Sequence, residues 1–122
     1  DQGIIYYHNV PLSGIVKSQY PDNKTKSKQT YKSGKPNGPY TEWYPNGQIR
    51  YSKNFKDGLQ EGKQKEWYWD GTLARAMKFQ AGKQQGDQIG WKENGDLRFK
   101  YTYINGKRYG FMGSALCQPP EG

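Results

Sequence analysis

The chain of 122 residues has few of the side chains that enzymes use for chemistry. It contains one histidine, His8, and one cysteine, Cys117. A single cysteine excludes an internal disulfide framework. No nucleophile motif, phosphate-binding loop or repeated pair of carboxylates at hydrogen-bonding positions is present. We therefore expect no catalytic residue, no cofactor and no metal site, and a protein that is not an enzyme.

Apolar residues are also scarce, at 32% of the chain, and no apolar run is long enough for a signal segment or a membrane span. The first residue is Asp rather than Met. A processed exported protein and a trimmed boundary both explain that start, and the sequence leaves both open. Disorder would also explain the polarity, but aromatic residues make up 16% of the chain and are regularly phased, which disordered segments are not.

The chain does contain a repeat of 24 residues. Residues 31–54, 55–78 and 79–102 are successive copies, with Tyr31, Phe55 and Phe79 in phase. Residues 4–30 form a degenerate first repeat, and residues 103–117 form a partial capping repeat, as terminal repeats often do. Residues 118–122 are a polar tail with little reason to be ordered. We expect one repeat domain, residues 1–122.

Two turn signals recur in each copy and predict the fold. One is Pro45-Asn46-Gly47, matched by Trp69-Asp70-Gly71 and Glu93-Asn94-Gly95. The other is Lys32-Ser33-Gly34, with Gly58, Gly82 and Gly106 in phase. Asn or Asp followed by Gly favours a tight hairpin, and no window shows uninterrupted helical periodicity. The sequence predicts an all-β, single-layer, twisted antiparallel meander of β-hairpin repeats, in which Gly47, Gly71 and Gly95 are structural positions.

The expected register pairs Tyr44 with Gln48 across the loop. Trp43 is then opposite Ile49, Thr41 is opposite Tyr51, and Glu42 lies across from Arg50. Alternation predicts an apolar face made of Thr41, Trp43, Ile49, Tyr51, Phe55, Trp67, Leu73, Met77, Phe79, Ile89, Trp91, Leu97, Phe99, Tyr101 and Tyr103. The opposite face would carry Tyr40, Glu42, Tyr44, Gln48, Arg50, Gln64, Glu66, Tyr68, Gln88, Lys92, Asp96 and Arg98.

An apolar face of this size needs a cover, because large apolar patches are rare on soluble monomers. We expect the sheet to coil so that its own aromatics close over one another, with dimerisation as the next possibility and the tryptophans largely buried. We interpret Trp43, Trp67 and Trp91 as a ladder that holds adjacent repeats together.

The repeated unit, an aromatic residue, two spaced glycines, a tryptophan and then Asn-Gly or Asp-Gly, resembles the bacterial variant of the MORN (membrane occupation and recognition nexus) repeat. The resemblance covers nearly the whole chain. It implies a scaffold or binding surface, as in the antitoxin-type and exported bacterial proteins of this kind. On that basis we favour a bacterial exported protein, periplasmic or a lipoprotein, over a cytoplasmic one.

Two groups of residues are candidates for binding a partner. Tyr40, Tyr44 and Tyr68 lie on the predicted polar face, where a ring with a polar tip suits recognition. The second group would gather on the basic edge beside the Gly34-type turns, and it comprises Lys32, Lys35, Lys56, Lys83, Lys107 and Arg108. The alternatives are cross-strand packing for the tyrosines and protection of the sheet from aggregation for the lysines.

A net charge of +8 favours an acidic partner. Our first hypothesis is a non-enzymatic module for protein–protein interaction, including an antitoxin- or immunity-like role. The alternative is peripheral attachment to an anionic membrane or cell-envelope polymer through the basic edge. Nucleic acid is not expected, because no nucleic-acid-binding module accompanies the charge. A homodimer is left open.

Overall fold

The computed structural model describes residues 4, 6–112 and 115–117, and for residues 111, 112 and 115–117 it describes the backbone alone. The expected tail, residues 118–122, and the side chain of Cys117 therefore lie outside the described part. Within that part every regular element is a β-strand. The prediction of an all-β fold is confirmed.

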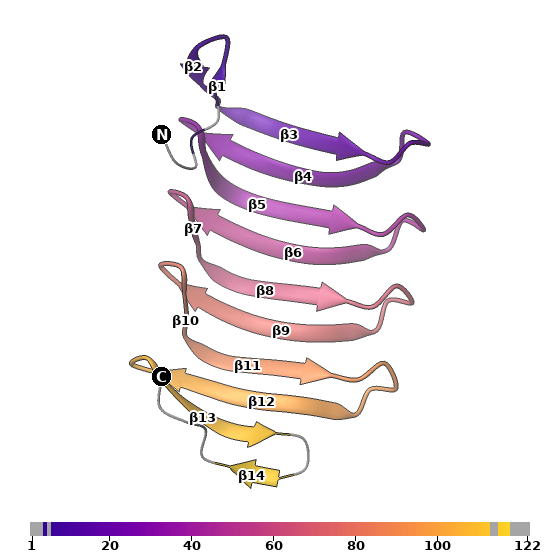
Figure 1. The fold of residues 1–122 in the computed structure, drawn as a ribbon, viewed down its shortest axis with the longest axis vertical. Helices are drawn as coiled ribbons and strands as arrows, with labels where there is room; N and C mark the ends of the chain where they lie inside the picture. The colour runs from indigo at the N-terminus through magenta and orange to yellow at the C-terminus, as the bar shows by residue number, and fades with distance from the viewer. Residues whose placement is uncertain (1–3, 5, 113–114, 118–122) are drawn as a thin grey trace.

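Fourteen strands form two sheets, and their bounds are β1 (Tyr6–Tyr7), β2 (Val10–Pro11), β3 (Gly14–Gln19), β4 (Thr25–Lys32), β5 (Lys35–Trp43), β6 (Ile49–Lys56), β7 (Leu59–Gln60), β8 (Gly62–Trp67), β9 (Leu73–Gln80), β10 (Lys83–Gln84), β11 (Gly86–Trp91), β12 (Leu97–Ile104), β13 (Lys107–Met112) and β14 (Ala115–Cys117). β1 and β2 pair with each other. The main sheet has the order β14-β13-β12-β11-β9-β8-β6-β5-β4-β3, with β7 paired to β6 and β10 to β9 (Figure 1).

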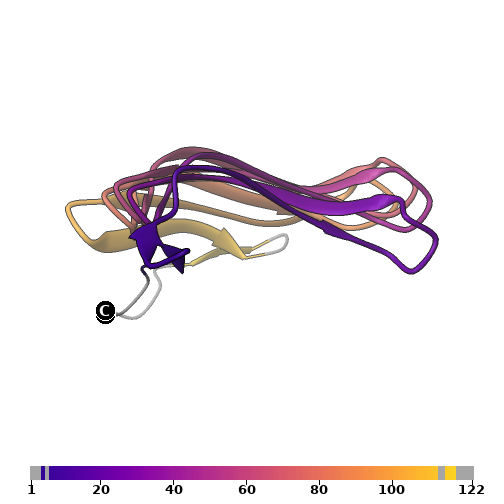
Figure 2. The ribbon, with the colours of Figure 1, turned by 90° about the horizontal axis from the view of Figure 1, so that it is seen from above.

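The main sheet is a single open layer. Neighbouring strands follow one another in sequence and run antiparallel, so the predicted meander is confirmed. Figure 2, a view along the array of strands, shows a thin ribbon layer that does not fold back over itself. The expectation that the sheet coils to close over its own aromatics is wrong.

The two turn signals form two different turns. At Pro45-Asn46-Gly47 only Gly47 has a positive φ, of 87°, and Tyr44 N–H donates to the Gln48 carbonyl at 2.8 Å. At the Gly34-type turns both central residues have positive φ, as in Asp57 (51°) and Gly58 (87°). Two consecutive positive φ values define the type I′ hairpin turn, whose twist matches that of the flanking strands.

A β-bulge next to each Asn-Gly-type loop changes the expected register. Trp43 is opposite Ile49 as predicted, but the ladder then shifts and Tyr51 pairs with Glu42 rather than with Thr41. The same shift recurs at Ser18/Gln19, Glu66/Trp67 and Gly90/Trp91. One extra residue on the returning strand moves every later side chain to the other side of the sheet.

The bulge divides the expected apolar face between the two sides of the sheet, so the predicted face was wrong. The side that we name the tryptophan face carries Thr41, Trp43, Ile49, Lys65, Trp67, Leu73, Ala76, Ile89, Trp91 and Leu97. The other side, the tyrosine face, carries Tyr40, Glu42, Tyr51, Phe55, Gln64, Glu66, Met77, Phe79, Gln88, Phe99, Tyr101 and Tyr103.

Packing in this layer is thin. Among the described residues Ala74 is the buried apolar residue, at 6% exposure, and the buried polar residues are Gln29 and Gln88. Gln88, which we expected on a solvated face, is only 1% exposed. Its side-chain oxygen accepts a hydrogen bond from the backbone N–H of Lys78, and its side-chain nitrogen donates one to the Lys78 carbonyl. Trp43, Trp67 and Trp91 are half-buried, not largely buried as expected, since a single layer covers one side of each ring only.

Candidate binding surface

A row of tyrosines links each repeat to the next. The hydroxyl of Tyr44 donates to the backbone carbonyl of Trp67 at 2.7 Å, and Tyr68 donates to Trp91 at the same distance. Tyr20 donates to Trp43 at 2.5 Å. The hydroxyls of two candidate partner-binding residues, Tyr44 and Tyr68, are therefore occupied within the sheet, and their half-buried rings are what these residues offer a partner.

The Gly34-type turns are docked on one another by a second set of bonds. The backbone N–H of Ser33, Asp57 and Ala81 donates to the side chain of Ser13, Asn37 and Glu61 respectively, each at 2.9 Å. The backbone N–H of Gly34, Gly58 and Gly82 donates to the carbonyl of Leu12, Pro36 and Gln60 respectively, at 2.6–2.8 Å. These bonds fix the edge of the sheet where the predicted basic residues stand.

The tyrosine face holds charges that are largely satisfied within the sheet. Arg50 forms the expected ion pair with Glu42 at 3.3 Å, although Tyr51 and not Arg50 is directly opposite Glu42. The guanidinium of Arg50 lies over the rings of Tyr44 and Tyr51. Tyr40 donates to Glu42 at 2.6 Å. Burial, followed by the bond to Glu42 and the charge of that carboxylate, raises the pKa of Tyr40 to about 12.

The tryptophan face is basic. On this face one row of directly paired residues runs across the sheet, and each strand is about 4.8 Å from the next. We name it the lysine row, and it consists of Lys17, Lys28, Thr41, Ser52, Lys65, Ala76, Ile89 and Lys100. A neighbouring row pairs Lys63 with Lys78. Among the described strand residues, Asp87 is the acidic residue on this face. Its carboxylate accepts a hydrogen bond from the hydroxyl of Thr102 at 2.8 Å.

The tryptophans stand beside this lysine row. Trp43, Trp67 and Trp91 each lie two residues beyond a member of the row on the same strand, and hence on the same face. The ammonium of Lys28 lies 5.9 Å from the ring centre of Trp43. Between the rows is a shallow depression of about 400 Å³ lined by Lys63, Lys65, Ala76, Lys78, Asp87 and Ile89.

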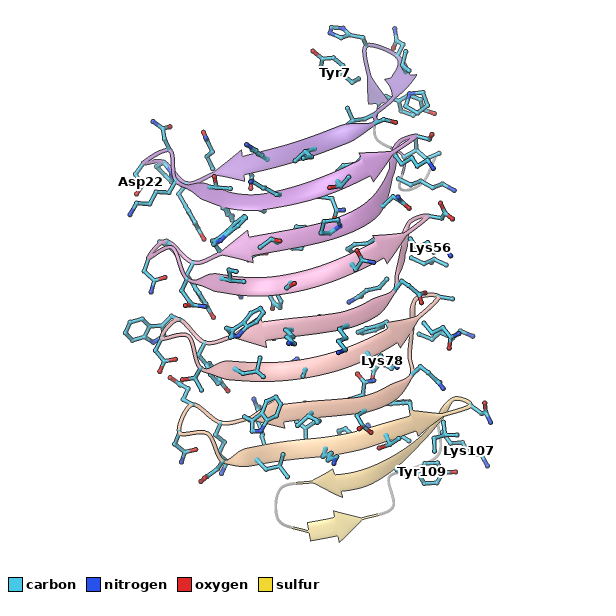
Figure 3. The ribbon with its side chains drawn as sticks, turned by 180° about the vertical axis from the view of Figure 1, so that it is seen from behind. Tyr7, Asp22, Lys56, Lys78, Lys107 and Tyr109 are labelled. Atoms are coloured by element: carbon cyan, nitrogen blue, oxygen red, sulfur yellow. The ribbon has the colours of Figure 1, made fainter. Side chains whose placement is uncertain are left out.

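The predicted basic edge is present. Lys32, Lys35, Lys56, Lys83 and Lys107 are exposed beside the type I′ turns, and Arg108 is half-buried with its guanidinium over the ring of Tyr101, 4.6 Å from its centre. Figure 3 shows Lys56 and Lys107 at one long edge of the sheet and Asp22 at the other. The charges are therefore separated across the length of the strands.

Two kinds of feature, a cluster of metal ligands and a membrane-spanning helix, are absent from the described residues. Residues 4, 6–112 and 115–117 contain no cluster of three or more His, Cys, Asp or Glu side chains suited to a metal. The same residues contain no helix long and apolar enough to cross a membrane. The surface therefore has to be interpreted from its charges and rings.

Comparison with known families gives two matches in the N-terminal part of the array. Residues 12–33 and residues 36–57 each match the family described as the MORN repeat variant. These two segments are therefore similar to MORN-type repeats. The comparisons with curated proteins and with solved structures found no match. The two MORN matches fall on β3–β4 and β5–β6, and the hairpins β8–β9 and β11–β12 repeat the same turns and bulges.

MORN repeats generally serve as binding or scaffold modules. The sequence did not single out Lys63, Lys65 and Lys78 as candidate binding residues. Lys63 and Lys65 share the face of Trp67 by simple alternation along β8, whereas the bulge after Leu73 moves Lys78 to that face. Sequence reasoning also missed Trp69, whose side chain is 63% exposed at the β8–β9 loop. The sequence did indicate that Trp69 lies in a loop, because Pro45 and Glu93 occupy the same position in the neighbouring copies.

Proposed function

We propose that this chain is a non-enzymatic binding module whose partner is an acidic protein that docks on the tryptophan face. The observation that carries the proposal is the sharing of one open face by the lysine row and the three tryptophans. The carboxylate of Asp87, which lies on the same face, already accepts a hydrogen bond from Thr102. Tryptophan is enriched among the residues that dominate the binding energy of protein interfaces, and the lysines select a negatively charged partner.

The half-burial of the tryptophans favours a protein over a lipid. Each ring rests on the sheet with one side covered, and Lys28 lies over Trp43. Such a ring can contact a surface laid against it but has little freedom to insert among acyl chains. The basic edge continues this surface, so Lys32, Lys35, Lys56, Lys83, Lys107 and Arg108 extend the attraction for an acidic partner.

The tyrosine face remains a candidate for contact through its rings. Tyr40, Tyr44 and Tyr68 are half-buried there, and their hydroxyls donate to Glu42, Trp67 and Trp91. A partner on this face would meet ring surfaces and paired charges, with less net attraction than on the tryptophan face. We therefore place the main contact on the tryptophan face.

The test is capture of proteins from an extract of the cells that make this chain, with a charge-reversed surface as comparison. A bait with Lys63→Glu, Lys65→Glu and Lys78→Glu should lose the captured protein, because three exposed lysines of the tryptophan face change sign. Lys53→Glu on the tyrosine face is the control and should retain it. Equal capture by the triple variant would refute the proposed surface.

The number of captured proteins distinguishes two forms of this function. An antitoxin- or immunity-like protein of bacterial origin would capture one dedicated partner in a fixed ratio. A scaffold would capture several proteins. The triple variant should lose each of them in either case.

A second candidate function is attachment to an anionic membrane or envelope polymer. The exposed lysines of the basic edge, beside the type I′ turns, favour it. Lysine clusters bind anionic lipid with roughly 1 kcal/mol for each residue near the surface. Sedimentation with vesicles of phosphatidylglycerol, compared with phosphatidylcholine, tests this directly. Binding to the anionic vesicles that disappears at about 0.5 M salt would support it, because screening is nearly complete there.

A further inference from the structure

The strand β3 is an unpaired edge of the main sheet. Among the described residues it is the last strand in the sheet order and pairs on one side only, with β4. All six residues of β3 are exposed, including Ile15 at 63% and Val16 at 40%. In the described part of the chain β1 and β2 form a separate hairpin, which Figure 1 shows beside the Gly14 end of β3 and not along it.

The backbone groups of β3 that face outward can be assigned from the repeat. Tyr20 directs its N–H and C=O groups into its own hairpin, to Lys24 and Asn23, as Tyr44 does to Gln48 and Gly47 in the next copy. Along one strand the N–H and C=O groups point alternately to the two sides. Ile15 and Lys17 therefore present N–H and C=O groups to solvent, where each later copy meets a neighbouring strand.

The charge around this edge is positive. β3 and β4 carry Lys17, Lys26, Lys28 and Lys32, and the loop between them carries Lys24. The acidic residue of this hairpin is Asp22, which lies 3.9 Å from Lys24. Lys17 is directly opposite Lys28, an arrangement of like charges that destabilises a strand pair unless a negative charge is placed beside it.

We propose that β3 accepts an extended acidic segment of a partner protein, which adds to the sheet as an antiparallel strand. The added strand would bond the outward groups of Ile15 and Lys17 and place a carboxylate opposite Lys17. A second copy of this chain is disfavoured as the occupant, because β3 against β3 brings two basic strands together. Strand addition at an exposed sheet edge is a general mode of peptide recognition.

This inference goes beyond the proposed function, because it concerns the open backbone edge of β3. Lys17 and Lys28 also belong to the lysine row of the tryptophan face, so the backbone variant Ile15→Pro is the one that separates the two proposals. The two surfaces are tested by different variants. The triple variant at Lys63, Lys65 and Lys78 leaves β3 unchanged. Loss of one activity with retention of the other therefore separates the two proposals.

The probe is a synthetic nine-residue peptide of alternating glutamate and valine, titrated into the isotope-labelled chain. Amide shifts should be confined to Gly14–Gln19 and its partner β4, and the amide hydrogens of Ile15 and Lys17 should exchange more slowly with solvent. The same peptide with lysine in place of glutamate should bind at least about fivefold more weakly, because it faces like charges. Equal binding of the two peptides would refute the charge argument.

Backbone blocking gives the decisive comparison. Ile15→Pro removes an outward N–H and keeps the β3–β4 ladder, since proline is tolerated on the open side of an edge strand. It should abolish peptide binding, whereas Ile15→Ala, which keeps the N–H, should retain it. Lys17→Glu, which needs no backbone change, should weaken binding of the acidic peptide about fivefold.

Three further results would overturn the proposal. The first is unchanged peptide binding by Ile15→Pro. The second is full affinity in Lys17→Glu. The third is a set of β3 amide shifts that depend on protein concentration without peptide, which would identify a second copy as the occupant.

Discussion

Tyr44 donates its hydroxyl hydrogen to the backbone carbonyl of Trp67, 23 residues further along the chain, at 2.7 Å. The bond joins two hairpins rather than two strands of one hairpin. It recurs from Tyr20 to Trp43 and from Tyr68 to Trp91. In a layer with so little buried apolar surface, such bonds are a main cause of cohesion between repeats.

Tyr68→Phe should therefore lower the free energy of unfolding by about 1 kcal/mol, the usual net value of one hydrogen bond. The variant keeps the ring and leaves the Trp91 carbonyl without its tyrosine donor. Urea unfolding measures the change. Tyr109→Phe, at a residue that is 43% exposed on β13, is the control and should have no effect. Equal stability of Tyr68→Phe and wild type would show that the tyrosine row does not hold the repeats together.

Ala81→Asn should stabilise the chain. Ala81 has a φ of 49° in a type I′ turn, a conformation that alanine resists and asparagine tolerates, and Asn105 occupies the same position of the next copy with a φ of 51°. We expect a gain of about 0.5–1 kcal/mol in unfolding free energy. Ala81→Val, with a β-branched side chain at the same φ, should lower stability. A lower melting temperature for Ala81→Asn would contradict the assigned turn.

Gly90→Ala should destabilise the sheet. A Cβ at position 90 would meet the ring of Phe99 at 2.3 Å, so the ring that covers Gly90 must move. Overpacking of this kind costs about 1–3 kcal/mol. Phe99→Leu provides the control, because in that background Gly90→Ala should cost much less. Additive losses in the double variant would show that the two residues are not in contact.

The pH dependence of stability tests the environment of Tyr40. Its pKa is about 12 in the folded chain against 10.0 ordinarily, so between those values the unfolded chain releases the proton and the folded chain keeps it. Stability from this group is complete below pH 10 and is lost as pH rises toward 12. In urea titrations between pH 10 and 12, the free energy of unfolding should fall less steeply with pH for Tyr40→Phe than for wild type. An unchanged slope would indicate an exposed hydroxyl.

The period, the turns and the single layer of strands could be predicted from sequence because glycine and asparagine mark each reversal of the chain. Asn46 and Gly47, repeated at intervals of 24 residues, leave few alternatives to a meander. The pairing of Trp43 with Ile49 followed from the loop length and is confirmed. These features depend on local backbone geometry, which the residue types largely determine.

The faces could not be predicted in the same way. The extra residue in each bulge, such as Arg50, has no sequence signal comparable to that of Gly47, and it transferred Tyr51 and Phe55 to the other side. The prediction that the sheet closes over itself was therefore also wrong, because it assumed one continuous apolar face. The lysine row of the tryptophan face, including Lys65, could be recognised only once the register across seven strand pairs was known.

The claim that the tryptophan face is the binding surface is tested most directly by site-specific photo-crosslinking. A photoreactive residue placed at position 65 on β8 faces the lysine row, and one at position 53 on β6 faces the tyrosine side. Both variants are used as bait in the same extract of the cells that make the chain. The account predicts a crosslinked protein from position 65 and none from position 53. A crosslink from position 53 alone would contradict it and would assign binding to the tyrosine face.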